Sequence, residues 1–151
     1  MSKPEFVYTT FIRSSPEKVF HALSDTAFTG KYWMGCILHS DWKVGSPMKM
    51  DRGGKTMNDC VILESDPPRK LSYSWLTVFD EAMKKEKPSK VTFLIEARDA
   101  NIVKLTVTHD GFSEGSTTLP SISTGWPMVL ASLKSLLETG QSLHIDPPKD
   151  A

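Results

Sequence analysis

The stretch that decides the fold is Ser123–Gly140, STGWPMVLASLKSLLETG. Its large apolar residues recur at the i, i+3, i+4, i+7 spacing of one helical face. They are Trp126, Val129, Leu130, Leu133, Leu136 and Leu137. This pattern predicts an amphipathic helix of about 14 residues that begins near Trp126, with Gly140 as its C-cap. Pro127 is tolerated in the first turn of such a helix; a helix that begins earlier, near Leu119, would contain the proline and kink there.

The chain before this helix is dominated by short segments typical of strands. They are Phe6–Arg13, Cys36–Ser40, Pro47–Asp51, Thr56–Glu64, Leu71–Val78, Lys90–Arg98 and Ile102–His109. Turn-rich gaps separate most of them, so consecutive strands are expected to pair as antiparallel hairpins. The longest charge-rich run, Asp80–Lys90, has mixed signs and a proline and is expected to be a solvated loop.

Two short helices are predicted between the first and second strands. Ser15 can cap the first helix and Pro16 suits its first position, while Thr26–Trp33 forms the second. The expected class is therefore α+β, with a curved antiparallel sheet of six to seven strands around a long C-terminal helix. We expect one domain over residues 1–151, with a core at about 6–140 and a frayed tail at 141–151 that contains two prolines.

Composition excludes several classes of partner. Lys and Arg total 18 and balance 18 Asp and Glu, so nothing favours nucleic acid or an anionic membrane. No apolar run approaches the roughly 18 residues of a membrane span, and the N-terminal segment lacks a secretory apolar region. We expect a cytoplasmic protein.

Metal and cofactor motifs are also missing. Cys36 and His39 are three apart in a strand and point to opposite faces, and Cys60 and His109 have no nearby ligand partner. The segment GGKT ends like a phosphate-binding loop, but position 49, which requires glycine, is Lys49, and a strand follows. We expect no metal and no cofactor.

Three motifs together resemble a known family. They are DPPRKLSYSW (66–75), LTVTHDGF (105–112) and GWPMVLASLKSLLETG (125–140), within a match from Tyr8 to Gly140. The set resembles the activator of heat-shock-protein-90 ATPase homologue family of the START-related (SRPBCC) superfamily. The resemblance implies a helix-grip fold of the START and Bet v 1 type, with a cavity for an apolar ligand between helix and sheet.

The predicted inner surface is rich in aromatic and methionine side chains. The candidate cavity residues are Trp33, Met48, Met50, Tyr73, Trp75, Phe93, His109, Trp126 and Leu130. Such side chains suit a ligand pocket, but they equally suit an ordinary core. His109 follows Leu105 and Val107 on one strand face. It is either a neutral buried histidine bonded to Tyr73 or to backbone, or a polar group at the cavity wall.

Three functions follow from these observations. The first is binding of a small apolar or aromatic molecule, by a monomer or homodimer with no catalytic residues. The second is stimulation of a chaperone ATPase, as the family name implies. The third is a cyclase- or hydrolase-type enzyme in which His109 and Tyr73 transfer protons.

Overall fold

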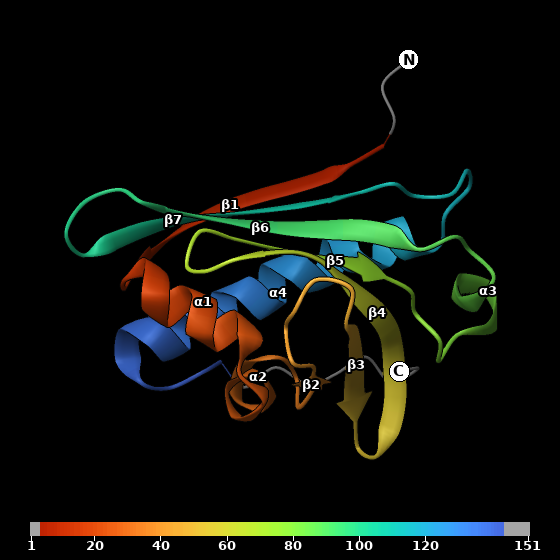
Figure 1. Ribbon diagram of the computed structural model, residues 1–151, viewed down its shortest axis with the longest axis horizontal. Helices are drawn as coiled ribbons and strands as arrows, with labels where there is room; N and C mark the ends of the chain where they lie inside the picture. Colours follow the sequence, from red (N-terminus) through yellow and green to blue (C-terminus); the bar gives the residue numbers. More distant parts are fainter. Residues whose placement is uncertain (1–3, 144–151) are drawn as a thin grey trace.

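The computed structural model describes residues 4–143, and its seven strands form one antiparallel sheet in the order β1-β7-β6-β5-β4-β3-β2 (Figure 1). The strands are β1 Phe6–Arg13, β2 Ile37–His39, β3 Pro47–Arg52, β4 Lys55–Asp66, β5 Lys70–Trp75, β6 Ser89–Ala97 and β7 Ile102–Asp110. The helices are α1 Pro16–Ser24, α2 Thr26–Tyr32, α3 Glu81–Lys84 and α4 Thr118–Thr139. The expected α+β class and both short helices after β1 are confirmed.

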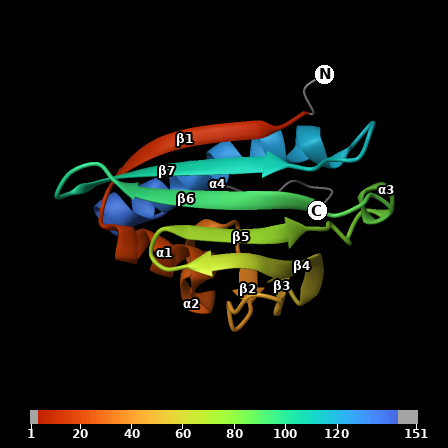
Figure 2. The same ribbon diagram turned by 45° about the horizontal axis from the view of Figure 1, so that its top comes forward.

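The sheet is a meander with one strand added at its edge. Strands β2 to β7 pair with their neighbours in chain order, and β1 pairs antiparallel with β7 over its full length. Figure 2 shows the strands side by side from β1 to β4, with α4 behind them. The long helix therefore covers one face of the sheet and leaves the other face to solvent.

Strand β4 bends the sheet around α4. Its 12 residues divide between two partners: Lys55–Val61 pairs with β3, and Ile62–Asp66 pairs with β5. The register shifts once in each half, and such irregularities increase the local twist and curvature of a sheet. The β3–β4 end therefore turns away from the plane of β5, β6 and β7.

Helix α4 is longer than expected. It has 22 residues and begins at Thr118, so Pro127 lies inside it; the predicted start near Trp126 is wrong, and the alternative start near Leu119 is confirmed. The apolar face continues one turn further back, because Ile122 is buried four residues before Trp126. The helix ends as predicted, since Gly140 adopts φ 84° and its N–H bonds Leu136 O at 2.9 Å.

Two other predicted boundaries are wrong. The expected loop at 80–90 contains the single helical turn α3, which Asp80 caps by accepting from Ala82 N at 2.9 Å. Strand β5 ends at Trp75 instead of Val78, since the chain continues along β4 through separate bonds such as Val78 N to Met57 O at 2.9 Å. This irregular segment carries Thr77 and Phe79 over the β3–β4 half of the sheet.

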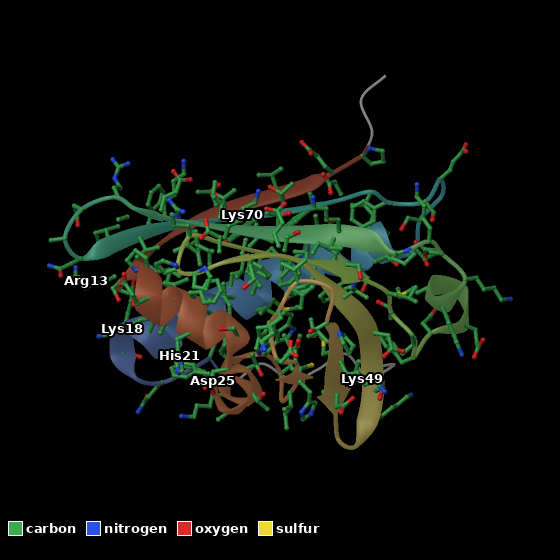
Figure 3. The ribbon with its side chains drawn as sticks, viewed as in Figure 1. Arg13, Lys18, His21, Asp25, Lys49 and Lys70 are labelled. Atoms are coloured by element: carbon green, nitrogen blue, oxygen red, sulfur yellow. The ribbon has the colours of Figure 1, made fainter. Side chains whose placement is uncertain are left out.

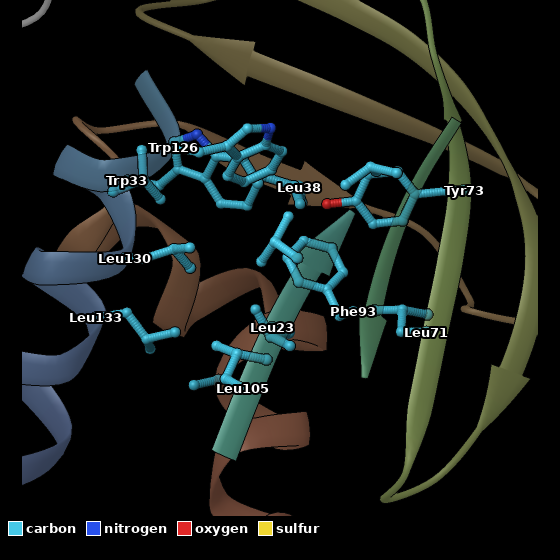
Figure 4. Packing of buried hydrophobic residues seen from close by; sticks show 14 of the residues in the cluster. Leu23, Trp33, Leu38, Leu71, Tyr73, Phe93, Leu105, Trp126, Leu130 and Leu133 are labelled. Atoms are coloured by element: carbon cyan, nitrogen blue, oxygen red, sulfur yellow. The ribbon is translucent and has the colours of Figure 1, made fainter. Parts of the chain in front are cut away.

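Most of the space between α4 and the sheet is filled by side chains. The filled core includes, among the residues with at most 1% exposure, Leu23, Leu38, Met48, Leu71, Tyr73, Phe93, Leu105, Leu130 and Leu133. Figure 4 shows Leu130 and Leu133 extending from α4 toward Leu105 and Phe93. The side chains of α4 and those of the central strands therefore pack closely against one another.

The chain beyond α4 first runs back along the helix. Leu143 N donates to Ser132 Oγ at 3.2 Å, and Ser135 Oγ donates to Gln141 O at 2.7 Å. The rest of the tail expected to fray lies outside the described residues. No described helix is both long enough and apolar enough to cross a membrane.

Candidate functional site

A cavity of about 280 Å³ lies between the first half of α4 and the β3–β4 half of the sheet. Trp33 follows α2, Trp75 ends β5 and Trp126 lies in α4, and all three line it. Their rings form one cluster: Trp33 lies 5.3 Å from Trp126 and 6.4 Å from Trp75, and Trp75 lies 5.4 Å from Trp126. These indoles form an aromatic wall where the cavity meets the filled core.

Thioether side chains form much of the remaining wall. Met50 and Met57 come from neighbouring strands and are 3% and 4% exposed, while Met34, Met83 and Met128 lie nearer the surface. Unbranched methionine side chains adapt to irregular apolar shapes. Exposed Ser121 and Thr124 of α4 stand at the rim, so the cavity opens to solvent there.

A buried amide fixes the orientation of one wall. With the Asn58 amide oriented so that both of its ends are satisfied, its oxygen accepts from the Trp75 indole N–H at 3.2 Å and its nitrogen donates to Met57 O at 2.7 Å. Thr77 and Thr118 also line the cavity and are 5% exposed. The cavity therefore offers an apolar body with a few neutral polar groups, the composition typical of small-molecule sites.

Behind the aromatic wall lies a hydrogen-bonded chain centred on His109. Trp126 Nε1–H donates to His109 Nδ1 at 3.1 Å, so the ring proton sits on Nε2, which donates to Ser89 Oγ at 2.7 Å. The Ser89 hydroxyl in turn lies 3.4 Å from Trp75 O. Burial lowers the pKa of His109 to about 3, so the imidazole is neutral.

This arrangement does not favour acid–base chemistry. The free lone pair of His109 accepts from Trp126, and its other nitrogen carries the proton, so His109 has no site to take the Ser89 proton. The partners predicted for His109, Tyr73 or backbone, are both wrong, because its ring bonds to the side chains of Ser89 and Trp126. The Tyr73 hydroxyl is buried without a hydrogen-bond partner, and burial raises its pKa well above the usual range.

The nine candidate residues divide between the cavity and the core. Trp33, Met50, Trp75 and Trp126 line the cavity. The other five, Met48, Tyr73, Phe93, His109 and Leu130, are fully buried and do not line the cavity; Leu130 lies on α4 and the other four on strands. Strand alternation identified the inner face correctly, but it carries no information on where along that face the packing is incomplete.

Several lining residues were missed by sequence reasoning. Arg52 lies two positions beyond Met50 on β3, so alternation alone places it on the same face. Met57 and Asn58 are adjacent and both buried, which alternation does not predict; the register shift in this hairpin explains it. A Cβ atom added at Gly125 would meet no other atom within 4 Å, so the cavity extends to the α4 backbone.

Metal-binding geometry is absent from residues 4–143. No group of three or more His, Cys, Asp or Glu side chains lies close enough there to hold an ion. Cys36 and Cys60 are buried free thiols, and burial raises the pKa of Cys60 to about 12.

Comparison with known proteins identifies a matching family and several similar structures. The family model described as activator of Hsp90 ATPase homolog 1-like protein matches residues 13–138. The Aha1 dimer from Colwellia psychrerythraea is 23% identical over 92% of this chain and 99% of its own, with a TM-score of 0.76. A protein from Mesorhizobium loti is 25% identical over 89% and 96%, also at 0.76.

An HSP90 activator from Plasmodium falciparum is 21% identical over 88% of this chain and 95% of its own, with a TM-score of 0.73. No curated protein matches the sequence. These similarities confirm the family resemblance and the helix-grip fold.

Proposed function

The chain belongs to the activator of Hsp90 ATPase homolog 1-like family, and within that family we propose that it binds a small apolar or aromatic molecule in the cavity beside α4. One observation carries the proposal: three tryptophans and several methionines surround space that no side chain fills. Protein cores normally contain no void as large as this cavity, and the rest of this core is filled by side chains.

The cavity volume limits the ligand. An apolar cavity of about 150 Å³ is large enough for benzene. About 280 Å³ therefore suits a molecule of two fused rings or a medium-length alkyl chain. A tryptophan-lined wall favours stacking with a planar aromatic ligand.

The test is a titration with 1-naphthaleneethanol, a neutral two-ring probe, followed by calorimetry and tryptophan fluorescence. We expect saturable binding that changes the fluorescence, because three tryptophans line the cavity. Gly125→Leu should abolish binding by extending a side chain into the cavity. Ala131→Leu, which adds the same side chain at an exposed position of α4, should leave it unchanged.

Absence of binding to the unaltered protein would contradict the proposal, as would equal binding to both variants. Native mass spectrometry of the purified protein complements this test, since a tightly held natural ligand would appear as added mass.

A second function, stimulation of a chaperone ATPase, is favoured by the family description and by the HSP90 activator among the similar structures. Under this second function the chain would form a homodimer, since one similar structure is an Aha1 dimer. The test is the ATPase rate of a heat-shock protein 90 with and without this chain, with sedimentation to give the oligomeric state. An unchanged rate would exclude this function. Gly125→Leu separates the two roles, because it blocks the cavity and leaves the outer surface intact.

A further inference from the structure

The cavity contains one charged side chain, Arg52. It lies on β3 two residues after Met50, on the strand face that looks toward α4. The preceding residue, Asp51, belongs to the opposite face, where its carboxylate lies 3.4 Å from His39 Nε2. Strand alternation therefore separates this cation from the carboxylate next to it in sequence.

Arg52 has no counter-ion in the described part of the chain. It takes part in none of the ion pairs found there, and its Nη2 atom is buried with no hydrogen-bond partner. Arg52 is half-buried as a residue, and because a guanidinium cannot lose its charge, the cost of burying its unpaired Nη2 is not relieved by deprotonation. Such a group is expected to find an acceptor.

The other lining residues do not supply a negative charge. None of them is Asp or Glu, and their polar groups are neutral amides and hydroxyls such as those of Asn58, Thr77 and Thr118. Cys36 also lines the cavity; burial raises the pKa of its thiol, although the charge of nearby Arg52 and a hydrogen bond from it oppose the rise, so the thiol supplies no negative charge. Within residues 4–143, therefore, no carboxylate is available to Arg52, and an anionic ligand would supply one.

We infer that the ligand is an amphiphilic acid, whose apolar body lies against Trp33, Trp75 and Trp126 and whose carboxylate pairs with Arg52. This inference rests on the proposed ligand-binding function and names its substrate class. A carboxylate matches the planar fork of a guanidinium through two parallel N–H to O bonds. In an apolar, partly enclosed site such a pair is stronger than at the surface.

The experiment compares two probes that share one naphthalene body and a two-carbon side chain and differ in the end group. Calorimetry gives the dissociation constants of 1-naphthaleneacetate, which is anionic at pH 7, and 1-naphthaleneethanol, which is neutral. We expect the acid to bind the unaltered protein at least tenfold more tightly. Arg52→Gln should remove that preference and leave the affinity for the alcohol within about twofold. The matched control is Lys49→Gln, which removes the same charge from the outer face of the same strand, where Lys49 is exposed (Figure 3).

Three outcomes decide between the proposals. If the acid is preferred and only Arg52→Gln abolishes the preference, both stand. If both probes bind the unaltered protein equally, or Lys49→Gln acts like Arg52→Gln, the ligand class is wrong while the binding function survives. If neither probe binds, both proposals fail. The comparison of probes on the unaltered protein needs no variant, so it decides the ligand class even if Arg52→Gln fails to fold.

Discussion

At the residue scale, two buried tyrosines show how differently a hydroxyl can be accommodated. Tyr32 is 2% exposed and donates to Ala22 O at 2.8 Å. Tyr73 is fully buried, and its hydroxyl, red in Figure 4, points into the filled core without a partner. An unsatisfied buried hydroxyl costs about 1–3 kcal/mol, whereas a satisfied one contributes about 1 kcal/mol.

Removing each hydroxyl should therefore have opposite effects. Tyr73→Phe is expected to leave the free energy of unfolding unchanged or raise it by about 1 kcal/mol, since only an orphaned group is lost. Tyr32→Phe should lower it by about 1 kcal/mol, because Ala22 O loses its donor. Urea denaturation of both variants measures the difference. A clear loss in Tyr73→Phe would show that its hydroxyl is bonded in solution.

His109 should make the fold sensitive to acid. Its folded pKa is about 3 because of burial, below the usual value near 6.5, so the unfolded chain binds this proton first. The stability from this group is complete above pH 6.5 and declines as the pH falls toward 3. Between pH 7 and pH 4 the loss is about 3 kcal/mol from this residue alone.

NMR provides the direct measurement of this effect. The His109 ring signals should not titrate between pH 8 and pH 4.5 while the protein stays folded. A midpoint near 6 would contradict the neutral, Trp126-bonded ring described above.

The sequence was informative about His109 only to a point. Its two-residue spacing from Val107 and Leu105 predicted burial, and the residue is fully buried. Its partners lie on β6 and α4, and Ser89 and Trp126 are 20 and 17 residues away along the chain. Tyr73 lies on the same inner face of the sheet, but a shared face does not give side-chain direction.

At the element scale, the start of α4 depends on a residue far from the helix. Glu86, which follows α3, accepts from Ser116 Oγ at 2.6 Å and from Thr117 N at 3.1 Å and Oγ1 at 2.7 Å. Burial acts to raise the pKa of Glu86, but these hydrogen bonds outweigh it and lower the pKa. A carboxylate at a helix N-terminus also interacts favourably with the helix dipole.

Glu86→Gln should therefore destabilise the protein by about 1 kcal/mol at pH 7, in the range of a lost N-cap. The depressed pKa fixes the pH dependence: the contribution of Glu86 is present above its unfolded pKa of about 4.3 and is lost as the pH falls through the lower folded value. Urea denaturation at pH 7 and pH 3 should show the two proteins converging at the lower pH. The exposed Glu81→Gln serves as control and should change little.

Two glycines of the same helix should respond in opposite directions to alanine. Gly125 lies inside α4, with no atom within 4 Å of the position of a new Cβ, so Gly125→Ala should stabilise by about 0.5–1 kcal/mol. Gly140 holds φ 84° at the C-cap, so Gly140→Ala should destabilise by about 1 kcal/mol. Thermal unfolding of the pair measures both. A loss of stability in Gly125→Ala would show that the cavity closes onto the helix in solution.

The sequence predicted the end of α4 better than its start. A glycine with a positive φ at the C-cap is a local requirement, and Gly140 meets it. The start depends on Ser116, whose hydroxyl accepts from Thr118 N at 3.0 Å, and on distant Glu86. A proline inside the expected region also favoured the shorter helix, although Ile122 continued the apolar face beyond it.

At the scale of the whole molecule, the space between helix and sheet has two parts. The filled core is centred on β5, β6 and β7 and extends to Leu38 of β2 and Met48 of β3. The cavity is lined by other residues of β3 and β4, the strands that curve away from the central sheet in Figure 1. The family resemblance implied a cavity; strand alternation placed Trp75 on the inner face, and helical spacing placed Trp126 on the apolar face of α4. The position of the cavity follows from the irregular hairpin of β3 and β4 and from the early end of β5, neither of which has a sequence period.

Replacing two methionines by alanine, one in the filled core and one at the cavity, tests whether the space between helix and sheet has these two parts. Met48 is fully buried in the filled core, and Met57 is 4% exposed but lines the cavity. Met48→Ala should cost about 3–4 kcal/mol, because packed neighbours surround the deleted atoms. Met57→Ala should cost less than about 2 kcal/mol, since a side chain facing a void has contacts on one side only. Urea denaturation gives both values, and equal slopes would show that the unfolded states are comparable.

Probe binding should rank the two variants in the opposite order from stability. Met57→Ala should weaken 1-naphthaleneethanol binding, because the variant loses part of the wall that the ligand contacts, while Met48→Ala should retain it wherever the protein is folded. Because the stability and binding effects run in opposite orders, a general loosening of the fold could not produce both. Equal unfolding costs together with equal probe affinities would mean that side chains fill the cavity in solution, and the division into two parts would then be wrong.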